Sequence, residues 1–235
     1  MITYIRSYLM VINKIIISPH FDDACLSAFA ELDDKSLVVA IFSGFPKIEQ
    51  KTDWDIFCGF KNSTEAVSKR AKENETASKY IGFKTIDLGF IDWQYNQAIN
   101  KGNINREIMK VIKRHPSATI FCPLSFGVSI EHPDHILMTE IILEVSSDLK
   151  STLFFYADLP YQINRKLDWV KIENKEKKIS TCKIYKSQLS SLFETFPGFN
   201  YSSLANEAYL TLKEALNLRE RAKVLNHHLD SSHSK

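Results

Sequence analysis

Two short motifs hold the side chains of this 235-residue chain that are best suited to catalysis. Residues 20–23 read His-Phe-Asp-Asp, and residues 132–135 read His-Pro-Asp-His. Imidazoles and carboxylates bind zinc, and a catalytic zinc site takes three protein ligands and keeps a position for water. Either carboxylate of the first motif and either imidazole of the second could bind metal, which would leave the other to face water or substrate. Taken singly, each motif is explained equally well by histidine packing or helix capping.

Apolar runs and helical periodicity show which elements must position these motifs. Strands are predicted over residues 14–17, 37–42, 85–88, 119–122, 152–156 and 170–172. Helices are predicted over residues 24–32, 65–81, 104–114, 136–145, 178–193 and 217–228. Strands that alternate with helices indicate an α/β, Rossmann-like fold, with a mostly parallel sheet and helices on both faces.

The predicted sheet brings the two motifs to one place. His20 and His132 both follow predicted strands. Ligands of parallel sheets bind beyond the carboxyl ends of the strands, so we expect both histidines at the same edge. A shared edge favours one joint site over two unrelated structural motifs. We expect residues 1–235 to form a single domain, with the motifs in a core over roughly residues 14–190 and a helical tail after it.

Composition disfavours several other classes of protein. The formal net charge of +2 is too small for a nucleic-acid-binding surface. No apolar run reaches the roughly 18 residues of a membrane span. No G-x-G-x-x-G follows the first strand, which disfavours a dinucleotide-binding enzyme. The four cysteines form no Cys-x-x-Cys pair, so we expect a reduced, cytoplasmic protein. The sequence leaves the oligomeric state open, a homo-oligomer included.

The two motifs, in this order, resemble the signature of the LmbE-like, or PIG-L, family of zinc-dependent N-deacetylases. That signature pairs (A/S)-H-x-D-D with H-x-D-H. Weaker similarities extend over roughly residues 14–190: RAKE at 70–73, LGFID at 88–92, YADLPY at 156–161 and YKSQ at 185–188. The resemblance implies the LmbE-like version of the fold expected above.

The resemblance also implies a metal site with one Zn²⁺ per chain. Its ligands would be His20, Asp23 and His135. Asp22 would be the general base that takes a proton from the attacking water. Ala24 departs from the family pattern, in which many members have Glu, and this bears on the subgroup more than on the activity.

The remaining roles concern the substrate. By resemblance, His132 stabilises the tetrahedral oxyanion or protonates the departing amine, and Asp134 orients it. Arg70 and Asp92 would hold the sugar-like substrate. The expected reaction is removal of an N-acetyl group from an amino sugar or glycoside, carried by a small molecule or a glycoconjugate. The alternatives are a zinc amidase that cuts a non-sugar or longer-acyl amide, and a catalytically inactive sugar-binding relative.

Overall fold

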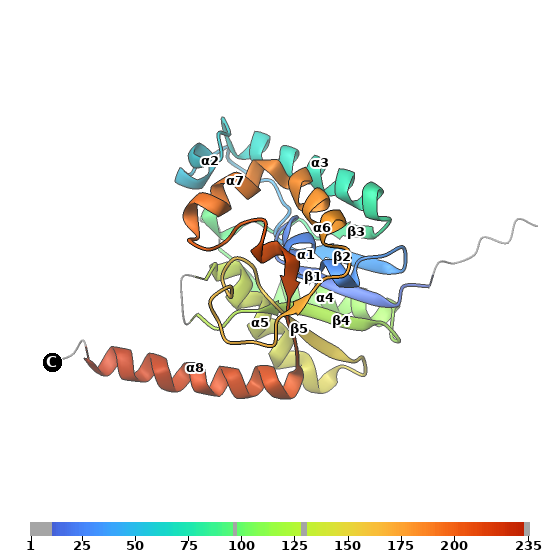
Figure 1. Cartoon of the computed structure of the whole chain (residues 1–235), viewed down its shortest axis with the longest axis vertical. Coiled ribbons are helices and arrows are strands. Elements are labelled where there is room, and N and C mark those ends of the chain that lie inside the picture. Colours follow the sequence, from blue (N-terminus) through green and yellow to red (C-terminus); the bar gives the residue numbers. More distant parts are fainter. Residues whose placement is uncertain (1–10, 96–97, 128–130, 233–235) are drawn as a thin grey trace, which may run out of the picture.

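A six-stranded sheet organises the chain, whose computed structural model describes residues 11–95, 98–127 and 131–232 (Figure 1). The strand order is β3-β2-β1-β4-β5-β8. The strands are β1 (Lys14–Ser18), β2 (Ser36–Ala40), β3 (Lys84–Asp87), β4 (Thr119–Leu124), β5 (Leu153–Ala157) and β8 (Tyr209–Thr211). The first five are parallel, and β8 runs antiparallel to β5. A separate antiparallel pair joins β6 (Val170–Lys171) and β7 (Asn206–Glu207).

Helices cover both faces of this sheet. They are α1 (Asp23–Ser27), α2 (Asp53–Phe57), α3 (Ser63–Ile81), α4 (Lys101–Arg114), α5 (Pro133–Val145), α6 (Lys175–Cys182), α7 (Lys186–Thr195) and α8 (Leu212–Ser232). In Figure 1, α3, α6 and α7 lie on one side of the sheet, and α5 and α8 lie on the other. Among the residues that the structure describes, no helix has both the length and the apolar character needed to cross a membrane.

The central strand β1 shows why the sheet is covered twice. Successive side chains of a strand point to opposite faces. Ile15 and Ile17 belong to the core formed with α4, α5 and α8, whereas Ile16 belongs to the core that includes residues of α1 and α3. All three side chains are completely buried, as expected of a parallel strand between two helical layers. The predicted fold class is confirmed.

The helix predicted over residues 24–32 is shorter than expected. α1 ends at Ser27 and a 3₁₀ turn follows it. The Glu207 carboxylate accepts hydrogen bonds from the backbone N–H groups of Phe29 at 2.7 Å and Ala30 at 3.1 Å. These donors are therefore satisfied by a side chain from a distant part of the chain, so the helix need not continue.

The helix predicted over residues 178–193 is divided into α6 and α7 by a 3₁₀ turn. Contacts with α3 surround the break. The Tyr185 hydroxyl donates to Asn74 at 3.0 Å, and the Ser187 hydroxyl and backbone N–H both donate to Glu73 at 2.5 and 3.1 Å. Two short helices can turn both Tyr185 and Ser187 toward α3.

The loop between β2 and α3 contains the short helix α2, which is not among the helices predicted from the sequence. Thr52 caps this helix: its hydroxyl accepts from the backbone N–H of Asp55, and the Asp55 carboxylate accepts from the backbone N–H of Thr52. Both bonds measure 3.1 Å. This reciprocal capping box satisfies two helix-terminal donors and fixes the helix despite its length.

Candidate active site and metal centre

The two sequence motifs meet at the carboxyl edge of the sheet. β1 leads into a turn that carries His20 and Asp22, and α1 begins at Asp23. His132 caps the N-terminus of α5, because its Nδ1 accepts the backbone N–H of Asp134 at 3.3 Å. A proline fills the first helical position, where its missing N–H costs no hydrogen bond. The predicted meeting of the motifs at one edge is confirmed.

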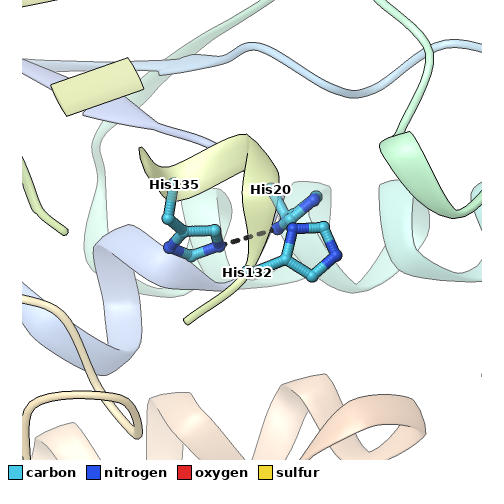
Figure 2. Close-up of side chains that lie close together, drawn as sticks. All are labelled: His20, His132 and His135. Carbon is cyan, nitrogen blue, oxygen red and sulfur yellow. Dashed lines mark hydrogen bonds between the residues drawn. The ribbon is translucent and has the colours of Figure 1, made fainter. Parts of the chain in front are cut away.

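Three side chains point atoms toward a common centre. His20 Nδ1 lies 3.1 Å from His135 Nε2, and these two rings are joined by the dashed line in Figure 2. Asp23 Oδ2 lies 3.6 Å from each of these nitrogens. The same oxygen accepts the backbone N–H of His20 at 2.6 Å, which holds the carboxylate in place.

The other nitrogen of each imidazole faces a carboxylate. His20 Nε2 lies 3.1 Å from Asp134 Oδ2 and 3.5 Å from Asp92 Oδ2. His135 Nδ1 contacts the Asp158 carboxylate, and both Asp134 and Asp158 are completely buried. Burial lowers the pKa of His20, but Asp92 and the neighbouring carboxylates more than offset this and hold the pKa well above its ordinary value.

This arrangement suits a metal ion. A ring nitrogen that donates its proton to an outer carboxylate leaves the inner nitrogen with a lone pair. In the neutral rings, the inner nitrogens of His20 and His135 would face each other at 3.1 Å as two acceptors, and a bound cation would replace the proton that the surrounding carboxylates otherwise favour on His20. A tetrahedral zinc ion with bonds of about 2.0–2.2 Å sets its ligand atoms about 3.3–3.6 Å apart. The two distances of 3.6 Å from Asp23 Oδ2 fit that spacing, and the 3.1 Å between the nitrogens of His20 and His135 is slightly shorter.

His132 lies beside this centre with a more open environment. Its ring centroid is 4.8 Å from that of His20, in an edge-on arrangement that Figure 2 also shows. A quarter of its side-chain surface is exposed, whereas His135 is almost fully buried. Burial, together with the positive charge of His20, lowers the pKa of His132 to about 3. The surroundings of His132 therefore favour its neutral form, at the edge of the cavity.

Asp134 was predicted to orient His132, and its shorter contacts are with other groups. Its Oδ2 lies 3.1 Å from His20 Nε2 and accepts the backbone N–H of Trp93 at 3.1 Å. The distance to His132 Nδ1 is 3.7 Å. The carboxylate therefore fixes His20 more directly than it fixes His132.

Arg70 reaches the site from α3 and bridges two carboxylates. Its Nη1 donates to Asp92 Oδ2 at 3.4 Å, and its Nη2 lies 4.0 Å from Asp22 Oδ1. Burial and the adjacent Asp23 raise the pKa of Asp22, against the opposing charge of Arg70. All the residues predicted for the site thus gather at one place, and Arg70 lies closest to Asp22 and Asp92.

Comparison with known families accounts for this geometry. The model of the PIG-L family, described as GlcNAc-PI de-N-acetylase, matches residues 15–146, which is more than half of the chain. The chain belongs to the PIG-L family. The matched span contains every residue predicted for the site. A search of curated proteins found no match.

Several solved structures share the fold of this PIG-L chain. The A40926 pseudoaglycone deacetylase Dbv21 aligns with a TM-score of 0.69 and 21% identity, covering 86% of this chain and 98% of that chain. The zinc-inhibited form of the teicoplanin deacetylase Orf2 aligns with a TM-score of 0.65 and 20% identity, covering 75% of this chain and 85% of that chain. The N,N'-diacetylchitobiose deacetylase from Pyrococcus horikoshii aligns with a TM-score of 0.57 and 18% identity, covering 75% of this chain and 70% of that chain.

A carboxylate that contacts a candidate metal ligand lies beyond the matched PIG-L span. Asp158 follows β5 and was given no role from the sequence, although it falls within the quoted YADLPY segment. A usable signal was present: Asp158 comes two residues after the strand predicted over residues 152–156, and an acidic residue just past a strand of the same parallel sheet should lie at the edge that carries the site. The backbone N–H of Trp93 gave no such signal, because main-chain donors leave no mark in the sequence.

A cavity of about 350 Å³ opens over the centre, within the usual size range of small-molecule sites. One part of its lining is polar and consists of His20, Asp22, Asp23, Arg70, Asp92, Gln94, Glu131 and His132. The remainder comes mainly from α7 and the loop after β5, and consists of Leu26, Trp54, Trp93, Pro133, Leu159, Pro160, Tyr161, Gln188, Leu192, Thr195 and Phe196.

Proposed function

We propose that this PIG-L family member is a zinc-dependent hydrolase that removes an N-acetyl group from an amino sugar or glycoside. The observation that carries this proposal is the set of His20 Nδ1, Asp23 Oδ2 and His135 Nε2 at zinc-ligand spacing beneath a cavity. The family description, GlcNAc-PI de-N-acetylase, and the deacetylases that share the fold support the class of reaction.

In this proposal His20, Asp23 and His135 hold the zinc ion. When bound, the ion would polarise the acyl carbonyl and make water acidic enough to supply the nucleophile near neutral pH. Three protein ligands leave room for water and the carbonyl oxygen, as in other catalytic zinc sites.

Asp22 is the proposed general base. It is buried at the N-cap of α1 and lines the cavity, but its carboxylate supplies none of the three inner donor atoms. A carboxylate in this place can accept a proton from the attacking water and pass it on to the leaving amine. Arg70, at 4.0 Å, limits where that carboxylate can lie.

His132 is proposed to act on the substrate rather than on the metal. Its ring lies at the cavity, and its Nδ1 accepts the backbone N–H of Asp134, so the neutral ring carries its proton on Nε2 and can donate it to the developing oxyanion or to the departing amine. Arg70 and Asp92 also line the cavity, and we assign them the sugar hydroxyls. Asp134 is proposed to orient both histidines: its carboxylate contacts His20 Nε2, and its backbone N–H donates to His132 Nδ1 at the start of α5.

Release of acetate tests the reaction. Purified, zinc-loaded protein should liberate acetate from N-acetylglucosamine presented free, as a glycoside or linked to a nucleotide. Amine release without acetate, from other amides in the same assay, would instead favour a zinc amidase of different acyl preference. Absence of hydrolysis across all of these amides would contradict the proposal.

Zinc content should be one ion per chain. Protein stripped with a chelator should lose its hydrolytic activity, and added zinc should restore both the metal and the activity, because the three donors form a preorganised site. Elemental analysis measures the first and amine release the second. Protein that stays metal-free after zinc addition would show that these donors do not form a metal site.

Asp158→Asn should weaken zinc binding by about 10–100-fold, the usual effect of losing a carboxylate behind a ligating histidine. The carboxylate contacts His135 Nδ1, and a neutral amide accepts that N–H more weakly. Competition with a chromophoric chelator gives the affinity. The control is Asp168→Asn, which changes an exposed aspartate that also follows β5 in the sequence. It should leave the zinc affinity unchanged. Equal zinc affinity in both variants would remove Asp158 from the site.

A further inference from the structure

Part of the cavity forms a continuous apolar surface, which we call the apolar wall. It consists of Leu26, Trp54, Leu159, Tyr161, Leu192 and Phe196. Five of these, all but Tyr161, belong to one packed cluster that also holds the start of the loop after β5 against α7. The wall is therefore part of the folded core and not a set of separate exposed side chains.

The apolar wall begins directly beside the candidate metal ligands. Leu26 lies three residues after Asp23, and residues three apart on a helix share a face. The ring centroid of Tyr161 lies 5.0 Å from that of His135 and 5.3 Å from that of Phe196. A substituent attached close to the reacting amide would therefore contact the apolar wall.

The polar groups of Trp54, Gln188 and Thr195, which lie on or beside the wall, already have protein partners. Gln188 accepts from Trp54 Nε1 at 3.0 Å, and its amide N–H₂ donates to Ser187 O at 3.0 Å and Cys58 Sγ at 3.6 Å. The Thr195 hydroxyl donates to a backbone carbonyl at 2.8 Å. Their donor hydrogens are used, so sugar hydroxyls placed here would exchange water for a surface that offers them little.

We propose that the apolar wall binds an apolar group that the substrate carries next to the scissile amide. This inference rests on the proposed function and narrows its substrate class: the preferred substrate is an N-acyl amino sugar with a ring or alkyl chain, not the free sugar. Two sources supply that chemistry, namely an aryl or alkyl aglycone on the anomeric oxygen or a longer acyl chain on the nitrogen.

Two substrate series separate these sources. The first bears methyl, butyl or phenyl groups on the anomeric oxygen of N-acetylglucosamine. The second carries acetyl, butyryl or hexanoyl groups on the nitrogen of glucosamine. In zinc-loaded wild-type protein, kcat/KM from amine release should rise about tenfold or more across one series, since one methylene in an apolar pocket is worth about 10–200-fold. The series that rises identifies the group that the wall binds.

A matched pair of variants ties this preference to the wall. Phe196→Ser should remove most of the advantage of the larger substrate over the smaller one. Phe193→Ser is the control, because Phe193 is also half-buried and belongs to the same cluster, but packs on Phe199 and Tyr201 outside the cavity. It should keep the advantage. A ratio of two substrates on one preparation is independent of the amount of folded protein.

The outcomes are distinguishable. Hydrolysis of N-acetylglucosamine with no gain in either series overturns the inference and leaves the proposed function standing. Full retention of the advantage in Phe196→Ser also overturns it. Absence of hydrolysis in every member of both series overturns the proposed function, and the inference with it. The wild-type series decide the question by themselves if a variant is not obtained.

Discussion

Asp22→Asn should retain its zinc, and its turnover rate should fall about 10²–10⁴-fold, the usual contribution of a general base. The amide has nearly the shape of the carboxylate and can still hydrogen-bond to water, but it cannot take the proton. The three inner donor atoms come from other residues, so the metal should stay. Turnover by acetate release and zinc by elemental analysis give the two results.

The control for this variant is Asp53→Asn, which removes the same charge from an exposed position on α2. Its turnover and zinc content should match those of the wild type. Asp22→Asn turning over at the rate of that control would show that another group takes the proton. Loss of zinc from Asp22→Asn would place the carboxylate in the metal site instead.

The two histidines of the second motif should respond differently to replacement. His135→Ala should lose most of its zinc, because two protein ligands make a poor site. It also leaves the buried Asp158 without its imidazole partner, so thermal stability should fall as well. His132→Ala should keep its zinc and lower kcat by about 10²–10³, as for removal of one oxyanion donor.

His132 also caps α5, so alanine there removes a helix cap as well as a reacting group. His132→Asn keeps a capping acceptor and should restore stability without restoring turnover. Zinc content, kcat and melting temperature measured on all three variants separate the effects. Zinc loss in the His132 variants, with zinc kept in His135→Ala, would show that the two roles are reversed.

The fold was predictable because its signals are local. The apolar runs over 14–17 and 119–122 identified two neighbouring central strands, and a parallel sheet then required the residues after them to share an edge. That reasoning placed His20 and His132 together. It could not choose the ring nitrogens, because the choice depends on Asp134 and Asp158 behind them.

What the sequence did not predict depends on contacts between distant residues. α1 stops early because Glu207 captures two backbone donors, and no pattern near residue 28 announces a carboxylate so far along the chain. α2 could have been predicted from the sequence, since Thr52 and Asp55 have the spacing of a capping box. The apolar wall could not have been predicted from the sequence, because Leu192 and Phe196 resemble ordinary core residues until the fold brings them to the cavity.

The match to the family ends at residue 146, yet the site does not. Donors of the candidate metal centre come from before that point, whereas Asp158 and most of the apolar wall come after it. The candidate metal ligands and most of the apolar wall are thus encoded in successive stretches of one polypeptide. If the wall selects the substrate as proposed, exchanging the later stretch between relatives, at the loop before β5, should change the substrate preference and leave the three candidate zinc ligands unchanged. A shortened chain that ends with the matched region would retain both signature motifs and lack most of the pocket they serve.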